Sequence, residues 1–136
     1  MRYMMLIYTQ EAQGAMTEQE VEDLKQRHRA VIEETARAGI FRGAEPLQGT
    51  NTATTLRMKD GNVLTTDGPF AETKEQLAGY YILDCKDLDE AIYWGSKIPT
   101  ACGGRAGSLE IRPIHETTSN AIADLAEKEL TTSSRA

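Results

Sequence analysis

The sequence of 136 residues predicts an α+β protein in which two helices cover one face of an antiparallel sheet. Three observations lead to this class. Two segments carry helix-capping residues, followed by apolar residues at spacings of three and four. Several short apolar or Thr-rich runs have the character of strands. Between two of these runs, an Asp-Gly pair marks a tight hairpin turn. The predicted order is βαββαβ with an extra hairpin inserted in the middle, in one domain over residues 1–115 and a polar tail over 116–136.

The composition is that of one globular domain. Hydrophobic residues make up 40% of the chain and charged residues 26%, both ordinary values. The net charge of −6 argues against nucleic acid as a partner, because its phosphates would be repelled. The apolar run Tyr3–Tyr8 is too short for a signal segment or a membrane span. We therefore expect a cytoplasmic protein with no membrane or nucleic-acid partner.

The two cysteines, Cys85 and Cys102, lack the spacing of a zinc site or a disulfide framework. Cys85 ends an apolar run and is predicted to be a small buried residue. Cys102 lies in a Gly-rich loop and is predicted to be exposed. That loop, residues 100–108, matches no phosphate-binding motif. We accordingly expect neither a metal nor another cofactor.

The chain begins with a predicted strand over residues 2–8, apolar enough for the centre of a sheet. Thr17 and Glu20 then have the spacing of a capping box. The helix that starts there is predicted to end at Gly39, a C′ glycine. Its inward stripe repeats at spacings of three and four: Val21, Leu24, His28, Val31, Ile32 and Thr35.

Residues 40–47 and 52–58 are predicted strands. Lys59-Asp60-Gly61-Asn62 supplies a type I′ hairpin turn, after which the chain returns through residues 63–66. The hairpin ends at Asp67-Gly68-Pro69, where glycine and proline require the backbone to turn.

After a polar loop, residues 79–85 predict a strand. Asp87–Glu90 has the pattern of a second capping box, and Pro99 is expected to end the helix that follows. The apolar face of this helix is Leu88, Ala91, Ile92, Trp94 and Ile98. Residues 109–114 are the final predicted strand, and Pro113 places it at a sheet edge.

This order suits a ferredoxin-like sandwich, in which both helices lie on one face of the sheet and the other face is open. Residues Tyr80–Leu83 are too apolar on both faces for one of them to remain in water. A second copy of the chain would cover that face, so we predict a two-fold homodimer. The tail, Glu116–Ala136, either forms a short helix that packs on a neighbour or stays mobile.

One run of twelve residues carries a family resemblance. Thr66–Leu77 reads TDGPFAETKEQL and is followed by Gly79 and Tyr80. It resembles the DGPF-domain branch of the YCII-related family. Further similarity lies in the N-terminal MRYMMLIY, in Thr52–Arg57 and in Glu110–Pro113, and the whole covers roughly residues 1 to 115. The resemblance implies a ferredoxin-like fold of the dimeric α-β barrel type and no known reaction.

Relatives with the short YCII domain look like candidate enzymes that carry a histidine on the first helix beside an aspartate. His28 is the matching position here, and Asp67 is the candidate acidic partner. Two interpretations of His28 are open: a core histidine bonded to a backbone carbonyl and a water, or a general base oriented by a carboxylate. Asp67 could form an Asx turn with its own downstream amides, or it could be the carboxylate that orients His28. One side chain can fill both roles.

Four further residues are candidate ligand-binding groups. Lys74 and Glu75 either anchor a polar ligand or form a solvated rim. Tyr80 and Tyr81 point to opposite sheet faces, so at most one of them lines a pocket, and Tyr81 is the candidate. Arg57 lies within a predicted strand and could bind a carboxylate or pair with Glu110.

Three functions follow from these residues. The first is a small cofactor-independent enzyme, similar to an isomerase or lyase, that acts on a small organic molecule. It would use His28 as general acid/base, oriented by Asp67, between the first helix and the sheet. The alternative is a non-catalytic dimer that binds a small ligand or regulates a partner. The third is a purely structural dimer.

Overall fold

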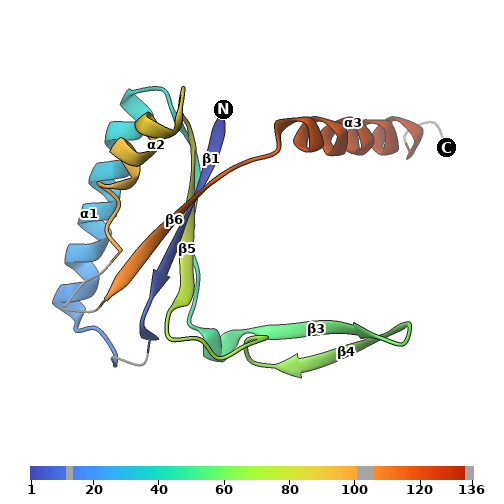
Figure 1. The fold of residues 1–136 in the computed structure, drawn as a ribbon, viewed down its shortest axis with the longest axis horizontal. Helices are drawn as coiled ribbons and strands as arrows, with labels where there is room; N and C mark the ends of the chain where they lie inside the picture. The colour runs from blue at the N-terminus through green and yellow to red at the C-terminus, as the bar shows by residue number, and fades with distance from the viewer. Residues whose placement is uncertain (12–13, 101–105, 134–136) are drawn as a thin grey trace.

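The computed structural model describes residues 1–11, 14–100 and 106–133 (Figure 1). Its main sheet is antiparallel, with four strands in the order β2-β5-β1-β6. The strands are β1 (Arg2–Thr9), β2 (Phe41–Pro46), β5 (Gln76–Asp84) and β6 (Gly107–Pro113). Helices α1 (Glu18–Arg37) and α2 (Leu88–Gly95) lie on the same face of this sheet. The predicted ferredoxin-like α+β architecture is confirmed, with β1 in the interior of the sheet and β6 at an edge.

The core lies between the helices and one face of β1 and β5. Burial alternates along both strands, since successive side chains point to opposite faces. Met5 of β1 and Leu83 of β5 are fully buried, and burial of each such side chain contributes roughly 1.5–3 kcal/mol. Cys85 is also buried, as predicted, whereas Cys102 lies outside the described residues.

The ends of α1 are as the sequence predicts. The hydroxyl of Thr17 accepts a bond from the amide of Glu20 (3.1 Å), and the carboxylate of Glu20 accepts one from the amide of Thr17 (3.2 Å). At the other end, the amides of Gly39 and Ile40 donate to the carbonyls of Ala36 and Thr35, the pair of bonds that defines a Schellman motif.

Helix α2 differs from its prediction at both ends. Asp87 caps it by accepting from the amide of Glu90 (2.9 Å), but among the described residues Glu90 makes no reciprocal bond. The helix also ends at Gly95, before Pro99. The amides of Lys97 and Ile98 bond carbonyls three residues back, which tightens the chain out of the α-helix before the proline, and Ile98 turns into the core.

The inserted hairpin forms a separate two-stranded sheet of β3 (Thr54–Lys59) and β4 (Asn62–Asp67), preceded by the short 3-10 turn η2 (Thr50–Thr52). At its tip Asp60 and Gly61 have φ of 50° and 80°, which confirms the type I′ turn. Strand β5 starts three residues earlier than predicted, because Gln76 and Leu77 continue the pairing with β1 beyond a bulge.

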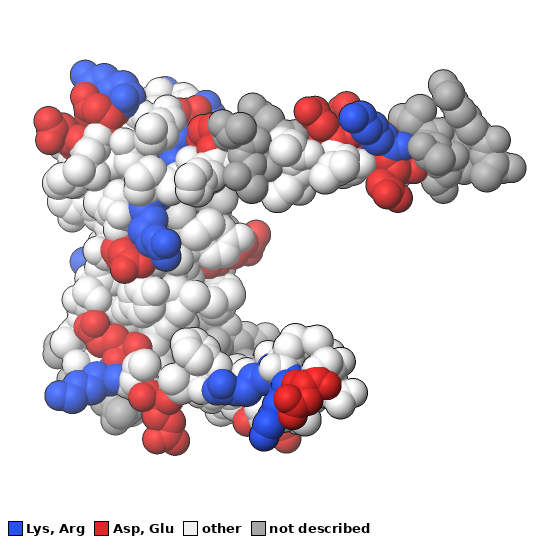
Figure 2. All heavy atoms as spheres, turned by 45° about the vertical axis from the view of Figure 1, so that its right-hand side comes forward, with Lys and Arg blue, Asp and Glu red and all other residues white. Residues whose placement is uncertain are grey.

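Two segments project from the sheet face opposite α1 and α2: the β3–β4 hairpin and α3 (Glu116–Ser133) (Figure 1). The tail was expected either to form a short helix or to stay mobile. It forms a helix, α3, which is longer than expected. The two projections and the sheet enclose a hollow in the space-filling view (Figure 2). Neither α1 nor α3, the longest helices of the described chain, is apolar enough to cross a membrane.

We predict that Gly79→Ala lowers the free energy of unfolding by about 1–3 kcal/mol, the usual cost of overpacking. A Cβ at Gly79 would lie 2.8 Å from the carbonyl oxygen of Glu45 and 3.2 Å from the Cα of Pro46, so β2 would have to move away from β5. Gly43→Ala on β2 is the matched control, because no atom lies within 4 Å of its added Cβ. Urea unfolding followed by circular dichroism measures both, and equal stability of the two variants would contradict the prediction.

Candidate functional site around His28 and Tyr81

His28 and Tyr81 meet between α1 and the sheet. The Nδ1 atom of His28 lies 2.6 Å from the hydroxyl oxygen of Tyr81, and the ring centroids are 5.7 Å apart. Phe41 of β2 packs with its edge against the Tyr81 ring at 6.5 Å. The Tyr81 side chain is almost fully buried (3% exposed), whereas His28 is only partly buried. The imidazole is therefore the accessible member of the pair.

Two sequence periods place these side chains together. His28 lies one helical turn before Val31 and Ile32 on the inward stripe of α1. Tyr81 lies between Gly79 and Leu83 on the buried face of β5, where the alternation of a strand directs every second side chain toward the helices. The stripe and the alternation were both visible in the sequence. Their meeting point was not, because it depends on how α1 crosses the sheet.

Both groups are neutral at neutral pH. Burial lowers the pKa of His28, and the positive charge of Arg27 lowers it further. Burial raises the pKa of Tyr81 to about 12, because the tyrosinate anion would lose its hydration. The contact is therefore a hydrogen bond between an uncharged imidazole and an intact phenol.

The burial of Tyr81 decides the direction of this bond. A buried hydroxyl proton without an acceptor costs about 1–3 kcal/mol, and among the described residues Nδ1 of His28 is the acceptor within reach. Tyr81 O–H therefore donates to Nδ1, and the ring proton of the neutral imidazole resides on Nε2. His28 thus presents an N–H group, backed by a buried phenol.

Asp67, the predicted carboxylate partner, lies elsewhere. It ends β4, at the base of the hairpin that leaves the open face of the sheet, whereas α1 covers the other face (Figure 1). Its side chain is exposed, and no hydrogen bond joins it to His28 within the described part of the chain. The structure therefore does not bring these two side chains together within one chain.

The turn at Asp67 is closed by other groups. The amide of Gly68 donates to the carbonyl of Ala53 (2.7 Å), and the hydroxyl of Thr55 donates to the carbonyl of Gly68 (2.7 Å). Across residues 14–100, no bond is accepted by the Asp67 carboxylate, so the predicted Asx turn does not form. The bonds at the hairpin base form this turn without the Asp67 carboxylate.

Arg57 and Glu75 have structural partners. The Arg57 guanidinium donates to the carbonyl of Phe70 (2.8 Å), which ties the loop after the turn to β3. Arg57 is on β3 of the hairpin sheet, whereas Glu110, its other predicted partner, is on β6 of the main sheet. The partly buried Glu75 accepts from the hydroxyl of Ser108 (2.9 Å), while Lys74 is exposed. These residues therefore lie near the hairpin base, at a distance along the sheet from Tyr81.

The loop before β5 is fastened at one more place. The amide of Glu11 donates to the side-chain oxygen of Gln76 (2.9 Å), and the Glu11 carboxylate accepts from the amide of Thr50 (3.0 Å). Gln76 in turn donates to the carbonyl of Thr73.

In the described ranges, no group of three His, Cys, Asp or Glu side chains is arranged to hold a metal ion.

Comparisons with known proteins place the chain in a family. The model of the YCII-related domain matches residues 1–118. A protein of Rhizobium meliloti (strain 1021), "Uncharacterized protein R00369", is 38% identical over 115 residues, which are 84% of this chain and 92% of that protein. The residues that the family model matches include the four-stranded sheet, its two helices and the inserted hairpin. The resemblance found in the sequence is thereby confirmed: the chain belongs to the YCII-related domain family.

Proposed function

We propose that the protein binds a small organic molecule at His28 and carries out acid–base chemistry on it without a cofactor. The observation that carries this proposal is the 2.6 Å bond between His28 and the buried Tyr81. It fixes the imidazole tautomer, so that Nε2–H is available to an oxygen atom of the ligand. A carbonyl or carboxylate oxygen is the acceptor that such a donor would select.

The pair can move a proton without charging the histidine. As negative charge develops on a substrate oxygen, Nε2 gives its proton to that oxygen while Nδ1 takes the proton of Tyr81. The products are a neutral substrate hydroxyl, a neutral imidazole and a tyrosinate. Because the pKa of Tyr81 is about 12, the relay suits strongly basic oxygens such as enolates and alkoxides.

Non-catalytic binding of a small ligand is the second candidate. Its support is the nature of the histidine's partner, which is a neutral hydroxyl instead of a carboxylate. A carboxylate would stabilise an imidazolium ion and raise the basicity of the ring, which a hydroxyl does not. A neutral N–H donor is sufficient to orient a ligand and needs no turnover.

We predict that Tyr81→Phe raises the pKa of His28 toward its ordinary value of 6.5. The phenol donates to the neutral ring only, so its removal withdraws stabilisation from the neutral form. Heteronuclear NMR of the imidazole measures both the pKa and the tautomer. A fall in the pKa, or a wild-type ring protonated at Nδ1, would show that the bond runs the other way.

We predict that stability falls with acid partly through His28. The folded protein binds the His28 proton less tightly than the unfolded chain, whose pKa is 6.5, so the contribution of the neutral ring is complete above this pH and is lost as the pH falls through the folded pKa. Urea unfolding of wild type and His28→Gln between about pH 8 and about pH 5 isolates this contribution. A wild type no more acid-sensitive than the variant would refute it, and His115→Gln is the control.

We predict exchange of solvent deuterium into carbon atoms next to a carbonyl group, measured by proton NMR on a panel of small keto acids, aldehydes and lactones. Donation to the carbonyl oxygen promotes transfer of the neighbouring carbon-bound proton to a base of the solvent, and the solvent returns a deuteron to that carbon. His28→Ala and Tyr81→Phe should therefore both slow exchange by about 10²–10⁴-fold. His115→Ala, at the exposed second histidine, should exchange like wild type.

The same panel separates the two candidates. Compounds that raise the melting temperature of wild type but not of His28→Ala, without any exchange, would establish binding alone. If no compound exchanges and none stabilises the protein through His28, the proposed site is wrong for carbonyl compounds.

A further inference from the structure

We propose that the ligand of His28 is a small oxo acid, whose carboxylate lies among the basic side chains of α1 while its carbonyl oxygen accepts the Nε2–H bond. This inference rests on the proposed function, since it names the class of molecule that the same site binds. It adds a negative charge to the oxygen atom that the imidazole selects. Three observations support it.

The first is the charge of α1 around His28. Residues 24–32 read LKQRHRAVI and contain three cations, Lys25, Arg27 and Arg29, and no carboxylate. The whole chain, in contrast, has a net charge of −6. A basic segment in an acidic protein creates a local positive potential, which attracts anions. The histidine lies in the middle of this segment.

The second is the arrangement of these cations around the helix. Each residue turns an α-helix by about 100°, so Lys25 and Arg29 lie about 60° and about 100° from His28 on one side. Arg27 lies about 100° away on the other side. Lys25 precedes His28 by three residues, which makes the two side chains neighbours on the helix surface. All three cations are exposed. The partly buried histidine therefore has a basic side chain on each flank.

The charge on one flank reaches the imidazole itself. Burial lowers the pKa of His28 most, and the positive charge of Arg27 lowers it further. The field that disfavours a proton on the ring favours an anion beside it. A neutral imidazole cannot attract a carboxylate by charge, so the basic side chains supply the attraction that the ring lacks.

The third is the placement of the nearest acidic groups on α1. Asp23 and Glu33 are each five residues from His28, so they lie about 140° away from it, on the outer face of the helix. Glu34 pairs with Lys97, which follows α2 (3.3 Å). An anion that approaches Nε2 along either flank of the histidine therefore meets basic side chains before acidic ones.

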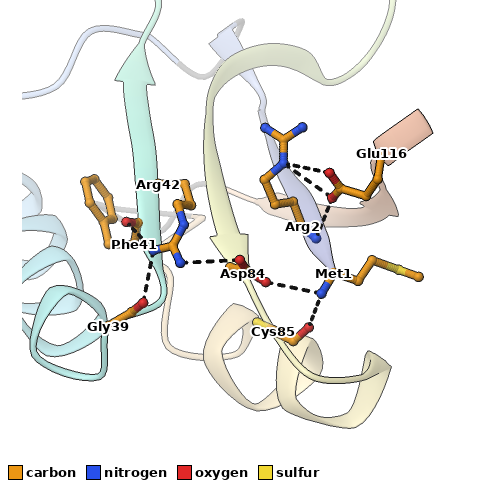
Figure 3. Close-up of polar contacts among 8 residues, drawn as sticks. All are labelled: Met1, Arg2, Gly39, Phe41, Arg42, Asp84, Cys85 and Glu116. Atoms are coloured by element: carbon orange, nitrogen blue, oxygen red, sulfur yellow. Dashed lines mark hydrogen bonds and ion pairs between the residues drawn. The ribbon is translucent and has the colours of Figure 1, made fainter. Parts of the chain in front are cut away.

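The cation of β2 is bonded elsewhere. The Arg42 guanidinium donates to the carbonyl of Gly39 (3.0 Å) and pairs with the Asp84 carboxylate (3.3 Å) (Figure 3). Ala44, which pairs with Tyr81 across the strands, has a short apolar side chain. The part of β2 beside the candidate site is therefore apolar, and the carboxylate of a ligand would be bound from the helix.

An oxo acid matches this arrangement because it carries a carbonyl oxygen and a carboxylate close together. The carbonyl oxygen accepts from Nε2, and the flexible stem of Lys25 allows its ammonium group to follow the carboxylate. Enolisation of such a molecule adds a second negative charge. The cations that bind the carboxylate would then also stabilise the charge that develops on the oxygen.

NMR titration of the full-length protein with pyruvate and with pyruvamide tests the inference. The two compounds share a methyl ketone and differ in the charge of the neighbouring group. Pyruvate should shift the imidazole signals of His28 with a dissociation constant about five- to tenfold lower than that of pyruvamide. Sodium chloride should weaken the binding of pyruvate and leave that of pyruvamide unchanged.

Lys25→Gln and Arg29→Gln should each weaken pyruvate binding by about two- to fivefold and leave pyruvamide binding unchanged. Lys59→Gln on the hairpin is the matched control, because it removes one positive charge far along the fold from α1, and it should bind both compounds like wild type. Circular dichroism establishes that each variant is folded before its binding is compared.

Four results would overturn the inference. These are unmoved His28 signals, equal dissociation constants for pyruvate and pyruvamide in wild type, unchanged pyruvate binding in both Lys25→Gln and Arg29→Gln, and an equal loss in Lys59→Gln.

The proposed function fails or stands separately. Exchange of neutral aldehydes and lactones through His28, without a preference for pyruvate, would overturn the oxo acid and leave the acid–base site standing. Pyruvate binding that depends on Lys25, without exchange of any compound, would support the oxo acid and restrict the site to binding.

Discussion

The pairing of β1 with β5 in the interior of the sheet is the constraint on which the rest of the structure depends. Because side chains alternate across a strand, this one register decides which residues lie under the helices and which face outward. Tyr81 is thereby buried beside His28, and Tyr80 is placed on the open face. A slip of one residue in β5 would exchange the two tyrosines. The candidate site and the open face of the sheet therefore depend on the same strand register.

The site differs from a histidine–carboxylate pair in how it treats charge. Burial disfavours both imidazolium and tyrosinate, so the resting state contains neither ion. A carboxylate in place of the phenol would favour a protonated ring and a stronger base. The neutral pair instead favours donation toward an oxygen that becomes negative. Electrophilic stabilisation of an enolate or alkoxide is the chemistry that this arrangement suits best.

Local signals predicted most of the fold, and the misses occurred where tertiary contacts decide. The cap at Thr17, the C′ glycine at Gly39 and the Asp60-Gly61 turn depend on a few neighbouring residues, and all three formed as predicted. Helix α2 ended early because its last turn tightens ahead of Pro99, which periodicity cannot reveal. His28 was recognised from its place on the inward stripe. Its partner was not, since the choice between Tyr81 and a carboxylate depends on the crossing of α1 over β5.

The Asp-Gly-Pro turn shows how a strong sequence motif can have a structural role. The Gly68 amide and carbonyl bond Ala53 and Thr55, and Arg57 bonds the carbonyl of Phe70, so the root of the hairpin is fastened to the loop that leads into β5. The Arg2–Glu116 contact fastens α3 to β1 in a comparable way. Both projections are thus attached to the two paired central strands. Because α3 is fastened to β1 and the hairpin leads into β5, the register that buries Tyr81 also sets the roots of both projections.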